Sequence, residues 1–323
     1  YAPTVSRLSE SLSKLRANPT YRRGQARIED VISGVPKVGS YLERTFDGAK
    51  AALRVMFEPP AFFEDLGVGY LGPLDGHDIA GLETALQNAT KMGGPVVVHV
   101  VTQKGRGYAP AENDPIKRMH DLSPLKPGSY TAAFSEAIVA EAEARPELVA
   151  ITAAMPDSTG LLPFGAALPE RLIDVGIAEQ HAVTSAAGMA MGGLRPVVAV
   201  YSTFLTRAID QVNLDVGLHQ LPVVFVADRA GITGDDGASH HGVLDMVLFS
   251  KVPDMTVFAP SSYAEVGQML HDALELCTEG PSLIRFSKTA PPTPEDGDCG
   301  SGLSARLVRE GSGQVCIIGV GKM

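Results

Sequence analysis

The sequence contains no tryptophan and only three cysteines among its 323 residues. Cys277, Cys299 and Cys316 are widely spaced and form no CxxC pair. That spacing is not typical of a disulfide framework or a structural zinc site, and it indicates a reducing compartment. No apolar run is long enough to cross a bilayer, so we expect no membrane partner and a cytoplasmic location.

The chain also lacks an initiator methionine, and its first residues, YAPTVSRLSE, lack the charged and apolar regions of a signal peptide. We therefore expect a fragment of a longer protein. The net charge of -10 argues against a general nucleic-acid surface, although a local arginine cluster can still bind a phosphate. Hydrophobic residues make up 45% of the chain, which is enough for a large core in two domains.

The first part of the chain changes character near residue 62. Residues 1 to about 58 have leucines at helical spacing and no obvious chemistry, so we interpret them as helical scaffold. From Phe62 we expect a strand with turns, then a helix capped by Asp78. The run PVVVHVVTQ is typical of a buried parallel strand. Residues 109–128 hold four prolines and many charges, which indicates a linker.

A second α/β domain begins near Ser129, because strand and helix patterns alternate from there. Residues 131–144 predict its first helix, and QVCIIGVG near the C-terminus resembles the first strand of a further domain. We divide the chain into 1–125, 126–292 and 293–323. The predicted strands of the second domain are LVAITAAM, RLIDVGI, PVVAVYSTF, LPVVFVADRAG, MTVFAPSS and SLIRFSK, and its later helices are RAIDQVNLDVGLH and AEVGQMLHDALELC.

The stretch DVGIAEQHAVTSAAGMAMGG, residues 174–193, places an acid where a strand passes into a helix. Glu179 stands in the first turn, where the helix dipole favours a carboxylate. Alanines repeat every four residues behind it, so this helix face can approach another backbone closely. From the residues alone, Glu179 is equally well interpreted as a functional acid or as an ordinary first-turn acid.

Polar residues follow several buried strands of the second domain. The residues that come at strand ends are Tyr201, Arg229, Arg285 and the loop GITGDDGASHHG. Parallel strands place those ends at one sheet edge. Glycine-rich loops of this length often close on a substrate. The aspartates and histidines of the loop match no standard ligand spacing, so we predict no metal site there. Tyr108 follows a glycine turn, KGRGY, that is either a cofactor loop or a simple turn.

Five motifs stand out along the chain: DVGIAEQHA, YSTFLTRAIDQ, DRAGITGDDGASHHG, GPLDGHD and KGRGYAPAENDP. Together they resemble the 1-deoxy-D-xylulose-5-phosphate synthases, which are thiamine-diphosphate enzymes of the transketolase superfamily. The resemblance covers nearly the whole chain and implies an α/β, parallel-sheet thiamine-diphosphate-binding fold with helices on both faces. The implied reaction joins pyruvate to D-glyceraldehyde 3-phosphate with loss of CO2, the first step of the methylerythritol phosphate route to isoprenoids.

The sequence departs from this family at both ends. Members carry an N-terminal GDG motif and a later asparagine that bind magnesium and the diphosphate, and neither is present here. Most of the C-terminal domain is also missing. The resemblance therefore implies thiamine diphosphate and Mg²⁺ as cofactors, with the metal ligands outside this segment.

The resemblance also implies roles for individual residues. Glu179 would hydrogen-bond the aminopyrimidine, Phe204 would stack on it, and Tyr108 would contact the cofactor. His240 and His120 match histidines that face the reaction centre, whereas His241 is interpreted as a loop residue. The implied substrate-binding residues are Tyr201, Arg207, Arg229, Asp236 and Arg285, with Arg229 and Arg285 suited to the phosphate.

The family further implies a homodimer with no nucleic-acid partner. Within enzymes, the alternatives are a transketolase and a pyruvate dehydrogenase E1-beta-like subunit. A different class of alternative is a non-catalytic fragment that only associates or binds the pyrimidine end of the cofactor.

Overall fold

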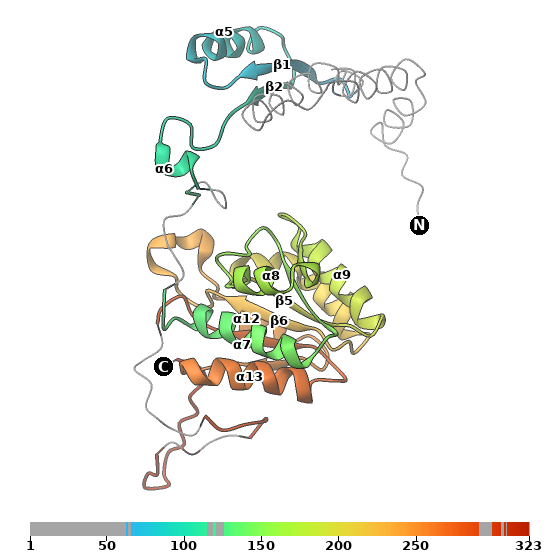
Figure 1. The fold of residues 1–323 in the computed structure, drawn as a ribbon, viewed down its shortest axis with the longest axis vertical. Helices are drawn as coiled ribbons and strands as arrows, with labels where there is room; N and C mark the ends of the chain where they lie inside the picture. The colour runs from blue at the N-terminus through green and yellow to red at the C-terminus, as the bar shows by residue number, and fades with distance from the viewer. Residues whose placement is uncertain are drawn as a thin grey trace. The chain divides into compact units, whose positions relative to one another are not determined.

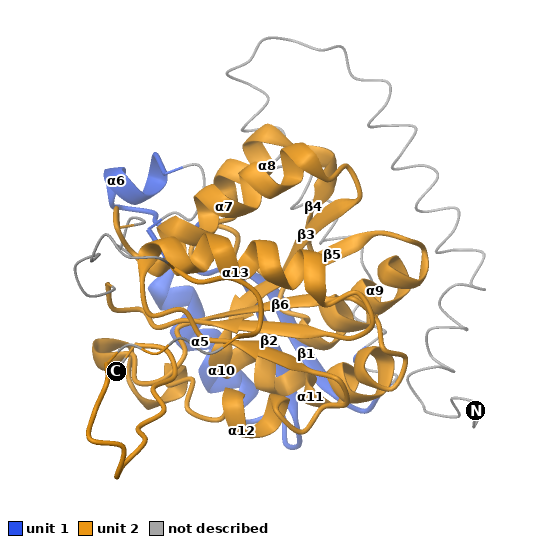
Figure 2. Cartoon of the chain, turned by 90° about the horizontal axis from the view of Figure 1, so that it is seen from below, with its two compact units in different colours: residues 1–122 blue, residues 123–323 orange. Residues whose placement is uncertain are grey.

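The computed structural model describes residues 63, 66–114, 119–120, 126–290, 299–304, 307 and 309–322. The chain divides into two compact units, residues 1–122 and 123–323, which Figure 2 shows in different colours. Each unit is described by itself. The helices predicted within residues 1–58 lie outside the described residues.

The first unit contains a strand, a helix and a second strand. Strands β1 (Gly69–Asp75) and β2 (Val96–Val101) pair in parallel, with Gly69 opposite Val96. Helix α5 (Ile79–Ala89) joins them, and the Asp78 carboxylate accepts a hydrogen bond from the Gly81 N–H at 3.1 Å. The predicted helix and its cap are therefore confirmed. A short helix, α6 (Ala109–Glu112), follows.

Strand β2 is not buried as the sequence predicted. Residues 96–99 are half-buried and residues 100–101 are exposed. Among the described residues its sheet has two strands, and helix α5 has no buried residue. A continuous apolar strand is buried on both faces only where helices cover both faces of its sheet. The prediction of a parallel strand is thus confirmed, and the prediction of burial is wrong.

The second unit is built on six parallel strands in the order β4-β3-β5-β6-β8-β7. The pairings confirm the predicted parallel sheet, and the four interior strands carry most of its buried apolar side chains. The strands are β3 (Leu148–Thr152), β4 (Leu172–Asp174), β5 (Arg195–Tyr201), β6 (Val224–Asp228), β7 (Thr256–Phe258) and β8 (Ser282–Arg285).

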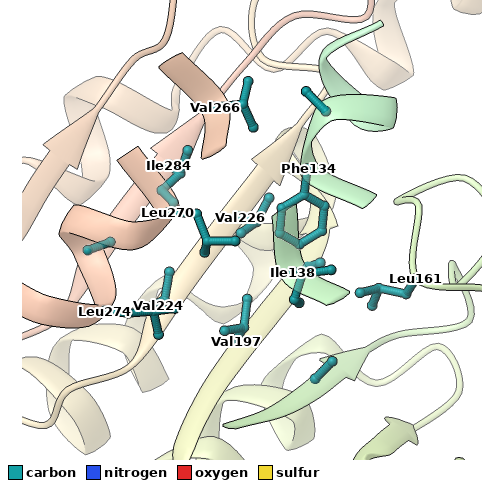
Figure 3. Close-up of a cluster of buried hydrophobic side chains, with 14 of the residues drawn as sticks. Phe134, Ile138, Leu161, Val197, Val224, Val226, Val266, Leu270, Leu274 and Ile284 are labelled. Atoms are coloured by element: carbon teal, nitrogen blue, oxygen red, sulfur yellow. The ribbon is translucent and has the colours of Figure 1, made fainter. Parts of the chain in front are cut away.

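Helices cover both faces of this sheet, as predicted. On one face, α7 (Tyr130–Ala144) and α13 (Tyr263–Leu276) lie side by side (Figure 1). Phe134 and Leu270 of these helices pack with Val226 of β6 (Figure 3). On the other face, α9 (Glu179–Met191) packs against Val198 of β5. Because successive strand residues point to opposite faces, one strand serves both cores.

The alanine face of α9 is buried within this same unit. Ala182 and Ala186 are fully buried and pack against the sheet. Small residues at these positions let the helix approach the strands closely. The close approach predicted from the alanine spacing is therefore made to the chain's own sheet.

Three segments differ from the predicted elements. The RLIDVGI strand is shortened to β4, a half-buried edge strand. The helix predicted from residue 207 is divided into short turns, including a π-helix at Val212–Gly217. Residues 314–321 form no strand, and their apolar side chains are exposed, as for Ile317 at 84% exposure.

The remaining helical elements are short. They lie mainly in the connections that leave the carboxyl ends of the strands. Their bounds are α8 (Leu162–Ala167), Pro169–Arg171, α10 (Ser202–Leu205), Thr206–Ala208, α11 (Ile209–Gln211), Gly234–Asp236, Ala238–His240 and α12 (Asp245–Phe249). Within the described ranges, no helix is long and apolar enough to traverse a membrane.

Candidate active site

The carboxyl ends of three adjacent strands gather polar residues at one edge of the sheet. Tyr201 ends β5 and pairs in register with Asp228, which ends β6. Arg285 ends β8 opposite Ala227 of β6. This arrangement confirms the prediction that these strand ends meet at one edge, where open α/β sheets bind ligands.

Glu179 is the first residue of α9 and is only 3% exposed. Its nearest described cation is Arg207, whose Nη1 lies 3.9 Å from Oε2. No hydrogen bond from the described residues reaches the Glu179 carboxyl group. Burial of an acid costs folding free energy unless a nearby charge or a bound ligand satisfies it. Glu179 is therefore a buried acid close to one cation, and its functional interpretation stays a prediction.

An aromatic cluster stands beside Arg207. The rings of Tyr201 and Phe204 stack with centroids 5.6 Å apart and planes inclined by 15°. The His240 imidazole meets both rings edge-on, at 5.4 Å from Phe204 and 6.4 Å from Tyr201. The Arg207 guanidinium lies 5.7 Å from the Phe204 ring centre. Contacts thus connect four predicted substrate or cofactor residues to Glu179.

Arg229 is held on several sides. Its guanidinium carbon lies 3.9 Å from the centre of the Tyr201 ring, a close cation–π contact. Its Nη1 donates to the Ser158 carbonyl oxygen at 3.0 Å, and its Nε lies 3.8 Å from Asp236 Oδ2. The guanidinium is therefore fixed in place without being saturated by strong ion pairs.

Arg285 is anchored by an acid that the sequence analysis missed. Its Nε donates to Asp245 Oδ2 at 2.7 Å, and Asp245 is buried at the start of α12. The bond uses Nε, and no described residue accepts from the two terminal nitrogens. An arginine held through Nε can direct its terminal nitrogens at an anion. The signal that was overlooked is an acid at a helix start just after a glycine-rich loop.

Lys288 is a second residue that the sequence analysis missed. Its Nζ lies 2.6 Å from Asp236 Oδ1 and 3.3 Å from Asp235 Oδ1. The two aspartates are unequal, because Asp235 is 94% exposed whereas Asp236 is largely buried. Lys288 therefore ties the glycine-rich loop to the segment that follows β8. Its position three residues after Arg285 was the available signal.

The loop between Gly231 and Gly242 is closed at its base. The two glycines exchange backbone hydrogen bonds of 2.7 and 2.8 Å. A Cβ at Gly242 would overlap the Ser202 side chain of α10, so a glycine is required there. His241 Nδ1 lies 2.9 Å from Thr233 Oγ1 within the loop, whereas His240 faces the aromatic cluster. This difference supports the choice of His240 over His241.

Two predicted site residues lie in the first unit. Tyr108 precedes α6 and is 57% exposed, and His120 is also exposed. The other eight predicted site residues lie in the second unit. The structure therefore brings those eight to one sheet edge, while the places of Tyr108 and His120 relative to that edge stay predictions.

The described residues suit one end of thiamine diphosphate. A buried carboxyl group that Arg207 links to a half-buried aromatic ring suits a polar, flat aminopyrimidine. The described residues hold no group of three or more His, Cys, Asp or Glu side chains placed to bind a metal ion. We therefore assign no metal ligand to them.

Comparison with known families gives two matches along the chain. The model for "Transketolase, pyrimidine binding domain" matches residues 126–293, more than half of the chain. The model for "1-deoxy-D-xylulose-5-phosphate synthase" matches residues 1–102. The first match spans the six-stranded sheet, and the second spans the strands of the first unit.

Curated relatives agree with these matches. The chain is 47% identical over 323 residues to 1-deoxy-D-xylulose-5-phosphate synthase of Mycobacterium avium (strain 104), covering 97% of this chain and 49% of the relative. The synthase of Mycobacterium tuberculosis (strain ATCC 25618 / H37Rv) is also 47% identical, over 96% of this chain and 49% of its own. The chain thus spans about half the length of the curated relatives it matches.

A solved structure described as "Split gene transketolase, inactive beta4 tetramer" is 29% identical to the chain. The match covers 55% of this chain and 56% of the transketolase chain, with a TM-score of 0.47.

Proposed function

The chain belongs to the transketolase family through its pyrimidine-binding domain, and from this membership we propose that the whole protein is a 1-deoxy-D-xylulose-5-phosphate synthase. The proposed reaction condenses pyruvate with D-glyceraldehyde 3-phosphate and releases CO2. The product would enter isoprenoid biosynthesis. The observation that carries the proposal is the buried Glu179, which Arg207 links to Phe204, at the sheet edge that also holds Arg229 and Arg285.

We assign the pyrimidine end of the cofactor to the second unit. Thiamine diphosphate, when bound, supplies a weakly acidic C2–H whose removal creates the nucleophile for pyruvate. Glu179 would donate a hydrogen bond to the pyrimidine ring nitrogen, and its burial would keep water from competing for that bond. Phe204 would stack on the pyrimidine plane, and Tyr108 is the proposed contact from the first unit.

We assign the phosphate of glyceraldehyde 3-phosphate to Arg229 and Arg285. A guanidinium binds phosphate oxygens through two parallel N–H groups, and both arginines are already oriented by protein contacts. Tyr201, Arg207 and Asp236 complete the substrate-binding set. Asp236 accepts a hydrogen bond from a substrate hydroxyl, while Lys288 and Arg229 hold the Asp236 carboxylate in place.

His240 and His120 are the proposed proton carriers. His240 stands against the aromatic cluster and its Nδ1 lies 2.9 Å from Ser239 Oγ, which fixes the ring orientation. A positioned histidine exchanges protons with a substrate oxygen near neutral pH. His120 would reach the same substrate from the first unit.

The remaining assignments concern the whole protein. We propose Mg²⁺ as the ion that binds the diphosphate, through residues outside this segment, a homodimeric assembly and a cytoplasmic location. We also propose that residues 1–125 are the rest of a diphosphate-binding domain, that 126–292 form the pyrimidine-binding domain, and that 293–323 begin a C-terminal domain.

The decisive experiment supplies the full-length protein with thiamine diphosphate and Mg²⁺ and compares two donors. Pyruvate with glyceraldehyde 3-phosphate should give 1-deoxy-D-xylulose 5-phosphate and CO2. Turnover of xylulose 5-phosphate instead would identify a transketolase, and turnover only with a partner subunit would identify an E1-beta-like chain. Residues 1–323 alone should neither bind the cofactor in a Mg²⁺-dependent way nor form product, which calorimetry and a product assay test.

A further inference from the structure

The end of strand β6 holds a carboxyl group that none of the assigned roles uses. Asp228 is fully buried, and its Oδ2 accepts a hydrogen bond from Thr131 Oγ1 of α7 at 2.7 Å. Its Oδ1 has no hydrogen-bond partner in the described part of the chain. That oxygen lies 3.6 Å from Nη1 of Arg229. An acid so deeply buried is costly unless it serves a neighbouring charge.

The backbone brings this acid and the arginine together. Arg229 has a φ of +59°, which is uncommon for a residue other than glycine. Its guanidinium lies near the carboxyl group of its own chain neighbour and over the Tyr201 ring. Backbone strain of this kind persists where the surrounding structure enforces it, and it is concentrated at functional sites.

The groups around Asp228 set its protonation. Burial raises its pKa to about 6, against the opposing effects of the Arg229 charge and the Thr131 hydroxyl. Tyr201 at the end of β5 is its register partner, and Arg285 stands at the end of β8. Arg285 is paired with Asp245, and beyond Arg229 lie Asp236, His240 and Lys288. The same edge also holds Asp235, His241, Arg207 and Glu179.

We propose that Asp228 is a positioning residue for Arg229: its buried carboxyl group holds the guanidinium beside the Tyr201 ring, and its ionisation sets the net charge that Arg229 presents to a tetrahedral anion. The inference rests on the proposed function, in which Arg229 binds the substrate phosphate. Neutral Asp228 leaves the full positive charge available, whereas ionised Asp228 cancels part of it. Anions should therefore bind more weakly as the pH rises through the ionisation of Asp228.

The test measures sulfate binding to the full-length protein by calorimetry from about pH 5 to about pH 8. Sulfate is the probe because its charge is constant over this range, whereas phosphate esters titrate within it. Sulfate should bind about threefold to tenfold more weakly at pH values above the ionisation of Asp228 than below it, a change called the step below. This size is expected for one added charge at short range in a partly polar medium. His240→Gln removes the histidine that faces the aromatic cluster, so a step that persists in this variant does not come from His240.

Three further variants complete the design. Asp228→Asn keeps an oxygen for Thr131 but cannot ionise, so it should abolish the step. Thr131→Val removes the hydrogen bond that favours the ionised form, so it should move the step to higher pH. Asp174→Asn is the matched control. Asp174 ends β4 in the same sheet, but its Oδ1 accepts from the backbone N–H groups of Ala154 and Gly176, so the step should be unchanged.

A step of unchanged size and position in Asp228→Asn, or pH-independent sulfate binding by the His240→Gln protein, would overturn the inference. If the protein forms product from pyruvate and glyceraldehyde 3-phosphate but gives either of these results, the role of Asp228 is wrong and the proposed function stands. A sulfate step that depends on Asp228 in a protein that forms no product would instead refute the proposed function and leave an anion site. With active enzyme, the step should appear in KM for glyceraldehyde 3-phosphate and not for unphosphorylated glyceraldehyde.

Discussion

Strands β2 and β6 have similar apolar sequences and opposite surroundings. VVVHVV of β2 is half-buried to exposed, whereas every residue of β6 is buried. The difference lies in the neighbours, because β6 has a strand on each side and helices over both faces. The residues that follow each strand differ in the same way. Arg229 contacts four groups of its own unit, while Tyr108 is largely exposed. An apolar strand thus creates a preorganised site only where the rest of the sheet surrounds it.

The largest expected loss of activity comes from replacing Glu179, at the carboxyl edge of the six-stranded sheet. Glu179→Gln should lower turnover of the full-length protein by about 10²–10⁴-fold, the usual range for losing a positioned proton-handling group. Exchange of the thiamine C2 proton, followed by NMR, measures the role directly. Exchange at the wild-type rate would remove Glu179 from the mechanism.

Glu265 provides the matched control for this change. It is also a buried acid in a first helical turn, but its Oε2 accepts hydrogen bonds from the Ser261 N–H at 2.6 Å and the Ser261 hydroxyl at 2.8 Å. Glu265→Gln should therefore reduce thermal stability while leaving proton exchange intact. Equal kinetic losses in both variants would mean that the loss in Glu179→Gln comes from disturbing a buried acid and not from a role in proton exchange.

The two strands themselves should respond differently to truncation. Val226→Ala in β6 leaves a cavity in the central core and should cost about 2–3 kcal/mol of unfolding free energy. Val98→Ala in β2 removes a half-buried side chain and should cost about 1 kcal/mol or less. Urea unfolding of the full-length protein, with a fluorescent probe in each unit, measures both. Equal costs would show that β2 is covered in the complete protein.

Arg229 and Arg285, at the carboxyl edge of the six-stranded sheet, should determine the preference for a phosphorylated aldehyde. Arg229→Ala or Arg285→Ala should raise KM for glyceraldehyde 3-phosphate, since each charge-assisted contact contributes about 1.5–3 kcal/mol. KM for pyruvate should change little. Steady-state kinetics with phosphorylated and unphosphorylated aldehydes separates binding from folding, because an equal loss with both aldehydes would indicate a structural role.

Asp228 should also make stability depend on pH. Its folded-state pKa is raised to about 6, above the value of about 3.8 expected when unfolded, so the unfolded state loses its proton first. The wild type should lose about 2–3 kcal/mol relative to Asp228→Asn as the pH rises through this window. The difference should be small below about pH 4 and constant above about pH 7. Urea titrations at several pH values measure it, and a pH-independent difference would contradict the expectation.

The smallest effect is expected at Lys288. Its ion pairs are partly exposed, and such pairs contribute about 0–1 kcal/mol. Lys288→Met should therefore raise KM for glyceraldehyde 3-phosphate less than fivefold, by about 1 kcal/mol at most, and the difference should shrink in high salt. Lys251→Met, at an exposed position between α12 and β7, is the control. An effect as large as that of Arg229→Ala would make Lys288 a direct substrate contact.

Local patterns in the sequence determined most of the second unit. Short apolar runs that alternate with helical periods predicted the parallel sheet, and the order of the chain placed Tyr201, Arg229 and Arg285 at strand ends. Parallel strands bring those ends to one edge whatever the side chains contact. The family motifs then suggested roles for residues that local patterns leave open, such as Glu179 and His240.

Only the tertiary structure decided which charges meet. Thr131 and Asp228 are 97 residues apart, Asp245 and Arg285 are 40 apart, and Asp236 and Lys288 are 52 apart. No periodicity links such positions, because their contact depends on strand order, on the φ of Arg229 and on the path of the glycine-rich loop. Burial was likewise beyond the sequence: the same apolar pattern gives an exposed strand or a buried one, since exposure is determined by the neighbours that cover it and not by the strand itself.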